Sequence, residues 1–262
     1  MTILTHGSDL SLAPGVEPLV RISGGSVRSA VERLSRLGFS AVQLDATLSG
    51  LRPRELGRRA RQDLLALLRR LGPRPGGLDL FIPRTHFLDP QHVDRAMAAT
   101  TAGIELAADL GRLPLSIVLP VKDIAEDARS ALVQSADDHG IRLGIHAEDH
   151  VDALLSWIQE VDLPALGAAI DPAAVLGRAE DPVRVCHRLG PRLVAARLCD
   201  FADGLRCHVG DGELDVMQYR IALDLAAGQR AGPIVLDLRG LKDPDQAARV
   251  AAKAWDDAGF KA

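Results

Sequence analysis

The feature that most constrains the fold is the alternation of short apolar segments with longer amphipathic ones along almost the whole chain. Proline, glycine and helix-capping residues separate these segments and mark their limits. We expect strands at 19–22, 41–44, 78–82, 115–119, 141–145, 166–170, 193–198 and 234–238. We expect helices at 26–37, 53–71, 89–110, 124–139, 151–159, from 181 onward, at 214–227 and at 244–255.

About eight strand–helix pairs predict a parallel sheet, because each helix carries the chain back to the start of the next strand. We expect α/β architecture with a single (β/α)8 TIM barrel domain over 1–262. Residues 1–17 would form an N-terminal extension or lead into the first strand. An open, doubly wound sheet is the alternative, but the number of pairs and the lack of a linker favour the barrel.

The composition supports a large core and argues against nucleic acid as a partner. Hydrophobic residues make up 47% of the chain and aromatic residues only 3%, so the core must consist mainly of Leu, Val, Ile and Ala. The formal net charge of −4 gives no general attraction to nucleic acid. We interpret the arginine-rich stretch 52–74 as a solvated helix face, with an anion- or partner-binding patch as the less favoured alternative.

Three features indicate a cytoplasmic protein. Cys186, Cys199 and Cys207 form no CxxC pair and no disulfide framework, which suits reduced thiols in a cytosol. The first residues are polar where a signal peptide needs an apolar run. No window holds the roughly 18 apolar residues that a membrane span requires, so we expect no membrane association.

Ionisable and polar residues follow the apolar runs, where a barrel would place its site at the carboxyl ends of the strands. A buried charge costs several kcal/mol unless it is paired. These side chains therefore either pair with one another across the barrel mouth or serve a ligand. They are Gln43, Asp45, Arg84, His86, Lys122, Asp123, His146, Glu148, Asp171, Arg197, Asp200, Asp237 and Arg239.

Six segments carry a resemblance to a known family through their order and spacing. They are 38–44 (GFSAVQL), 140–146 (GIRLGIH), 170–174 (IDPAA), 196–200 (ARLCD), 210–215 (GDGELD) and 232–237 (GPIVLD). Together they resemble strands two and five to eight, and the loop before the seventh helix, of the xylose-isomerase-like family of sugar isomerases and epimerases. The resemblance covers roughly residues 19 to 255.

The resemblance implies a divalent metal site, but this chain departs from the family pattern there. The four family ligands correspond to His146, Asp171, Arg197 and Asp237, and the family's second histidine corresponds to Ala174. Arginine stays protonated and has no free lone pair, so it cannot ligate a metal. We therefore favour no cofactor. A divalent ion (Mn, Mg, Zn or Co) on His146, Asp171 and Asp237 is the less favoured alternative.

Some relatives need no metal and use two carboxylates at the ends of strands five and eight, which correspond to His146 and Asp237. An imidazole passes protons near neutral pH, so we expect His146 and Asp237 to transfer protons. We expect Arg197 to stabilise a developing enediolate or hold a substrate anion. The expected substrate-binding residues are Asp171, His86, Gln43 and Glu148.

Two functions remain open from the sequence. The first is an isomerase or epimerase that acts, without a metal, on a small sugar-like or hydroxy-carbonyl compound. The second is a catalytically degenerate barrel that serves as a binding or partner protein, in line with the altered ligand positions. DNA-repair endonucleases share this fold, but they use a histidine-rich zinc cluster that this chain lacks. The sequence specifies neither the substrate nor an oligomeric state.

Overall fold

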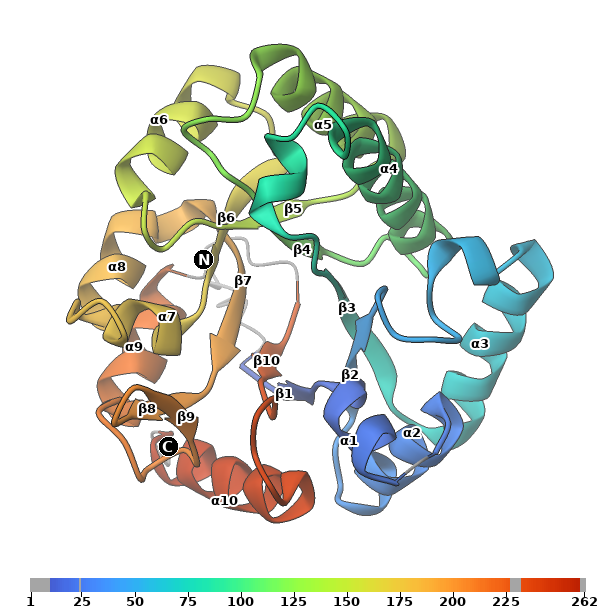
Figure 1. Ribbon diagram of the computed structural model, residues 1–262. Coiled ribbons are helices and arrows are strands. Elements are labelled where there is room, and N and C mark those ends of the chain that lie inside the picture. Colours follow the sequence, from blue (N-terminus) through green and yellow to red (C-terminus); the bar gives the residue numbers. More distant parts are fainter. Residues whose placement is uncertain (1–9, 24, 227–231, 260–262) are drawn as a thin grey trace, which may run out of the picture.

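Eight parallel strands surround one core in the computed structural model, which describes residues 10–23, 25–226 and 232–259 (Figure 1). They are β1 (Leu12–Pro14), β2 (Ala41–Asp45), β3 (Arg74–Leu80), β4 (Leu115–Val118), β5 (Leu143–His146), β6 (Leu166–Ile170), β7 (Leu193–Leu198) and β10 (Ile234–Leu236). Their order is β1-β10-β7-β6-β5-β4-β3-β2, and a parallel bridge between Gly15 and Gln43 joins the two end strands. The barrel is therefore nearly closed, which confirms the expected fold class.

Helices surround the strands and follow most of them in the chain. They are α1 (Val16–Ser23), α2 (Val27–Arg36), α3 (Arg58–Leu71), α4 (Val93–Asp109), α5 (Glu126–His139), α6 (Val151–Val161), α7 (Pro172–Leu176), α8 (Pro182–Leu189), α9 (Val216–Ala226) and α10 (Pro244–Asp257). Short 3-10 turns are η1 (Pro53–Glu55), η2 (Arg84–Phe87) and η3 (Gly190–Arg192). No helix within the described ranges is both long and apolar enough to cross a membrane.

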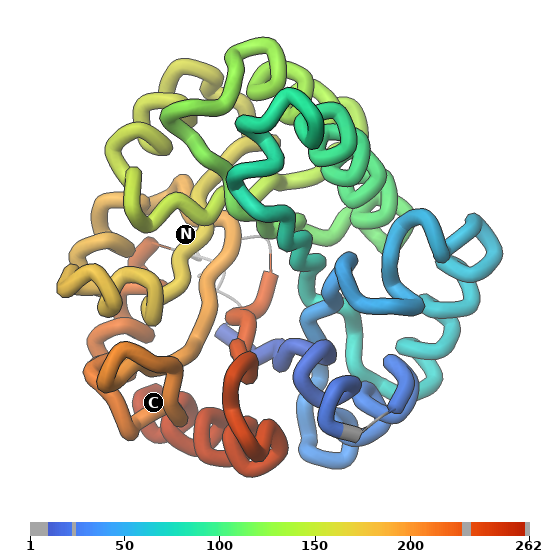
Figure 2. Tube along the Cα trace, viewed as in Figure 1, coloured from blue at the N-terminus to red at the C-terminus, as the bar shows by residue number. Residues whose placement is uncertain are grey.

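The expected first strand at 19–22 is wrong, because those residues belong to helix α1. Val16 and Leu19, which lie three residues apart on one helix face, are buried, while Ile22 near the end of the helix is 52% exposed. The true first strand, β1, lies within the segment interpreted as a lead-in. It pairs in parallel with β10, so the first and last strands of the barrel lie side by side in its wall (Figure 2). A three-residue apolar strand carries too little pattern to be recognised from sequence.

Strand β3 starts earlier than expected and passes through residues normally regarded as breakers. Gly76 and Gly77 lie within the strand. No larger residue fits at either position, because an added Cβ would meet a neighbouring side chain. It would lie 2.6 Å from Pro233 Cγ at Gly76, and 2.7 Å from Gln43 Oε1 at Gly77. The close approach of Pro233 at Gly76, and of Gln43 on β2 at Gly77, therefore requires glycine where the sequence suggests a turn.

The loop after β7 contains an antiparallel hairpin in place of the expected irregular loop. Its strands are β8 (Asp200–Ala202) and β9 (Leu205–Cys207). Asp203 and Gly204 connect them with φ values of 50° and 78°, as a two-residue hairpin turn requires. The Asp-Gly dipeptide was therefore a sequence signal for this hairpin.

Helix starts and stops follow the expected capping chemistry. Ser26 forms a capping box with Ser29, and Asp171, Asp181 and Asp243 cap helices whose first residue is proline. Helix α3 starts at Arg58 rather than at Pro53, since 53–55 forms a separate 3-10 turn. The expected helix end at 227 lies outside the described residues. The core is mainly Leu, Val, Ile and Ala, as the composition predicts.

Candidate active site

A small pocket lies at the carboxyl ends of the strands, where the barrel fold places function. Its volume is about 280 Å³, which suits a small ligand. We call it the mouth pocket. Its polar lining consists of Asp45, Asp79, Arg84, Ser116, His146, Glu148, Asp171, Arg197, Arg206 and Arg239.

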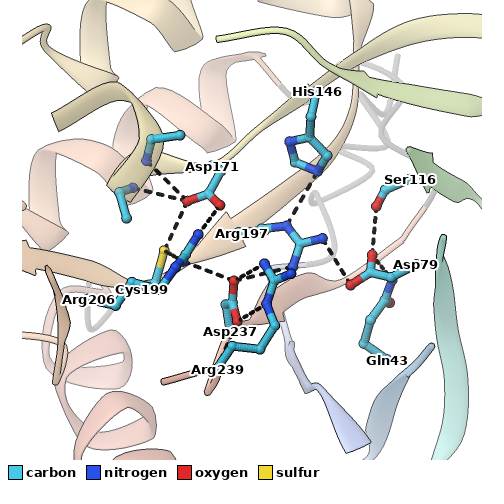
Figure 3. A network of polar contacts seen from close by, with 12 residues as sticks. Gln43, Asp79, Ser116, His146, Asp171, Arg197, Cys199, Arg206, Asp237 and Arg239 are labelled. Atoms are coloured by element: carbon cyan, nitrogen blue, oxygen red, sulfur yellow. Dashed lines mark hydrogen bonds and ion pairs between the residues drawn. The ribbon is translucent and has the colours of Figure 1, made fainter. Parts of the chain in front are cut away.

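Arg197, in β7, lies at the centre of a buried network (Figure 3). Its Nη2 lies 2.9 Å from Asp79 Oδ2, its Nη1 3.3 Å from Asp237 Oδ2, and its Nε 3.4 Å from His146 Nε2. Burial opposes its charge, but Asp79 and Asp237 outweigh burial and hold the pKa of Arg197 above its ordinary value. The guanidinium is therefore a permanent cation inside the barrel mouth.

Asp237, directly after β10, accepts from three arginines. Arg239 donates from Nε at 2.8 Å and from Nη2 at 2.5 Å, Arg206 donates from Nη1 at 3.0 Å, and Arg197 completes the set. Burial would raise the pKa of Asp237, but the hydrogen bond from Arg239 and the charge of Arg197 hold it far below its ordinary value. Asp237 is therefore a fixed anion.

Asp171, Cys199 and Arg206 form the second half of the network. Asp171 caps helix α7 and forms an ion pair with Arg206 Nη2. The Cys199 thiol donates to Asp171 Oδ1 at 3.2 Å. Burial would raise the pKa of Asp171, but the Arg206 charge lowers it overall. Burial and the Asp171 charge raise the pKa of the Cys199 thiol, which keeps its proton.

His146, at the end of β5, forms a dyad with Glu148. Its Nδ1 lies 2.7 Å from Glu148 Oε1, which also accepts from the Asp171 backbone N–H at 2.9 Å. Arg197 Nε can only donate, so His146 Nε2 accepts and the imidazole proton lies on Nδ1. The carboxylate therefore orients a histidine whose basic nitrogen faces the Arg197 guanidinium.

The structure brings together His146, Asp171, Arg197, Asp237 and Glu148, but it places two other expected residues elsewhere. Gln43 does not line the mouth pocket, and its Nε2 donates to Asp79 Oδ1 at 2.9 Å. His86 also lies outside the lining and stacks on His92, with ring centroids 4.7 Å apart. Gln43 therefore supports Asp79 from beneath the pocket.

Sequence reasoning missed Asp79, Arg206 and Cys199 as members of the network. Asp79 is the charged residue within the apolar end of β3, and a charge in a buried strand was a usable signal. Arg206 lies on the unpredicted hairpin, so nothing in the strand pattern pointed to it. Cys199 follows β7, but the sequence suggested only a reduced thiol there.

The residues present do not fit a divalent metal. Among the described residues, one group has metal-ligand spacing: atoms of Asp171, Cys199 and Asp237 lie within 4.8 Å of one another. Arg206 contacts all three, and its Nη1 lies 3.0 Å from Cys199 Sγ. A second cation there would be repelled and would meet a protonated thiol. No cluster of this kind within the described ranges includes His146.

Comparison with known proteins places the chain in a family. The family model described as "Xylose isomerase-like TIM barrel" matches residues 31–257. The chain belongs to the xylose isomerase-like TIM barrel family. This confirms the resemblance carried by the sequence motifs. No curated protein matches the chain.

Solved structures of this xylose isomerase-like barrel fold share its architecture at low sequence identity. D-allulose 3-epimerase from Methylomonas sp., in complex with D-allulose, has a TM-score of 0.70 at 16% identity, covering 96% of this chain and 98% of that one. The 3-keto-D-glucoside 4-epimerase from E. coli has a TM-score of 0.70 at 14% identity, covering 95% and 99%. A Mycobacterium smegmatis barrel protein in complex with magnesium has a TM-score of 0.64 at 16% identity, covering 98% of each chain.

Proposed function

We propose that the mouth pocket catalyses reversible proton transfer beside the carbonyl of a small sugar-like or hydroxy-carbonyl compound, without a metal. The reaction class is aldose–ketose isomerisation or epimerisation. The observation that carries the proposal is the His146–Glu148 dyad, whose unprotonated Nε2 faces the buried Arg197 cation. The family and the sugar epimerases that share the fold support the reaction class.

In this scheme His146 Nε2 takes the proton from the carbon next to the carbonyl. The electron pair of the C–H bond forms the enediolate, and its negative oxygen lies in the field of Arg197 and Arg206. For isomerisation, His146 then returns the proton to the former carbonyl carbon, while the hydroxyl proton of the original carbon moves to the former carbonyl oxygen. For epimerisation, the enediolate turns its other face to His146 before the proton returns to the same carbon. Glu148 stabilises the imidazolium between the two steps.

This scheme reassigns Asp237. The sequence suggested that Asp237 transfers a proton, but three arginines stabilise its charged form. A carboxylate held in this way does not take up a proton near neutral pH. We therefore assign Asp237 to the positioning of Arg197, Arg206 and Arg239, and the proton chemistry to His146.

Solvent exchange tests the proposal. The protein, treated with EDTA and dialysed, is incubated in D₂O with a panel of aldoses, ketoses and hydroxy-carbonyl acids, and deuterium at carbon is followed by NMR. Wild type should label at least one compound, and His146→Ala should be slower by about 10²–10⁴-fold, the usual contribution of a general base. Exchange that requires added Mn²⁺ would refute the metal-free scheme.

A degenerate barrel that acts as a binding or partner protein is the second candidate. The observation that favours it is that Asp79, Asp171 and Asp237 each already have an arginine partner, so the network is stable without a ligand. This candidate predicts that no compound of the panel exchanges.

A further inference from the structure

Arg206 reaches the network from the hairpin rather than from a barrel strand. It lies on β9, and its side chain points back across the strand ends toward Asp171 and Asp237 (Figure 3). Its Nη1 is 3.0 Å from both Cys199 Sγ and Asp237 Oδ2, and its Nη2 bonds Asp171 Oδ2. One guanidinium therefore contacts every member of the three-residue cluster with metal-ligand spacing.

The electrostatics of this cluster require a cation. Asp171 and Asp237 are both buried, and two buried carboxylates this close repel one another strongly. Arg197 contacts Asp237, while Asp171 has its ion pair with Arg206. A divalent ion at the centre of the cluster would also neutralise the two carboxylates, but it would compete with Arg206 for the same oxygens.

Hydrogen bonds to Asp200 fix the hairpin in the position that places Arg206 against the cluster. Asp200, fully buried at the start of β8, accepts from the backbone N–H groups of Gly210 at 2.9 Å, Gly212 at 3.1 Å and Leu214 at 2.9 Å. The Asp203-Gly204 turn then reverses the chain so that Arg206 pairs with Phe201. The buried aspartate thus anchors both ends of the segment that carries Arg206.

We propose that Arg206 is the built-in cation of this barrel: its guanidinium takes the place of a divalent ion on Asp171, Cys199 and Asp237, and its removal converts these residues into a metal site. The inference concerns metal binding and does not depend on the catalytic activity proposed above. It explains why the ligand pattern departs from the family pattern while the two aspartates remain.

Cobalt titration of the full chain tests this proposal, with Co²⁺ as the probe and visible absorption and calorimetry as readouts. EDTA-treated wild type should show no saturable site. Arg206→Ala should bind one equivalent at least about a hundredfold more tightly, since the guanidinium that contacts all three residues of the cluster is gone. The cobalt–thiolate absorption should vanish in Arg206→Ala/Cys199→Ser. Guanidinium ion at a non-denaturing concentration should displace cobalt from Arg206→Ala.

Two further variants make the outcome decisive. Arg84→Ala removes a pocket charge that pairs with Asp149 rather than with the cluster, and it should bind no cobalt. Arg206→Met keeps the length of the side chain if the alanine variant does not fold. A variant that folds only with cobalt also supports the proposal. Cobalt binding by wild type as tight as by Arg206→Ala, no binding by folded variants, or failure of both variants to fold with cobalt present would overturn it.

Discussion

Nη2 of Arg197 on β7 lies 2.9 Å from Oδ2 of Asp79 on β3, so one ion pair spans the barrel mouth between opposite walls. Asp79 is fixed in turn by Gln43 and by Ser116 Oγ, which donates at 2.8 Å. The pair is therefore part of the architecture as well as of the candidate site. Its removal should affect stability whether or not the protein is an enzyme.

Arg197→Ala should lower the free energy of unfolding by up to about 3–5 kcal/mol, the usual cost of breaking a buried ion pair, because Asp79 loses its arginine partner while Asp237 keeps Arg206 and Arg239. Urea denaturation measures this change. The matched control is Arg178→Ala, whose exposed pair with Glu180 should contribute less than about 1 kcal/mol. Equal effects of the two substitutions would show that the Arg197 network does not stabilise the fold.

Glu148→Gln should lower the deuterium exchange rate by about 10²–10⁴-fold, because a neutral amide does not stabilise the charge of the His146 imidazolium. Glu148→Asp should recover part of the rate. An unchanged exchange rate in Glu148→Gln would separate Glu148 from the proton transfer.

The network should make the protein sensitive to acid. The pKa values of Asp171 and Asp237 are lowered in the folded state, so their stabilisation is fully present above the unfolded value of about 4. It is lost as the pH falls through the lower folded values. Thermal unfolding between pH 7 and pH 2.5 should show Tm falling below about pH 4. The fall should be shallower in Asp237→Asn, and an equal fall in both proteins would contradict this account.

Gly77→Ala should destabilise the protein by about 1–3 kcal/mol through overpacking. The new Cβ would lie 2.7 Å from Gln43 Oε1 and would push the Gln43 amide off Asp79. Gly57→Ala is the control, because nothing lies within 4 Å of a Cβ there. Denaturation of Gly77→Ala/Gln43→Ala should show a smaller added loss than the sum of the single variants. If the two stability losses simply add, the new Cβ at position 77 does not contact the Gln43 side chain.

The sequence by itself determined the barrel and the meeting of His146, Asp171, Arg197 and Asp237. Apolar period, capping and glycine or proline punctuation are local signals, and parallel strands bring their carboxyl ends to one face wherever the helices return the chain. The same local signals misplaced the first strand, since β1 is three residues long and its pairing with β10 joins distant parts of the chain.

Only the tertiary structure decided which charges meet. Asp79 lies opposite Arg197 because β3 and β7 form opposite walls, and Arg206 reaches Asp171 because a hairpin folds back over the mouth. These contacts join residues far apart in sequence, so no local pattern of apolar and polar residues predicts them. They also decide the chemistry, because a carboxylate transfers protons, binds a metal or serves as a fixed anion according to the cations placed around it.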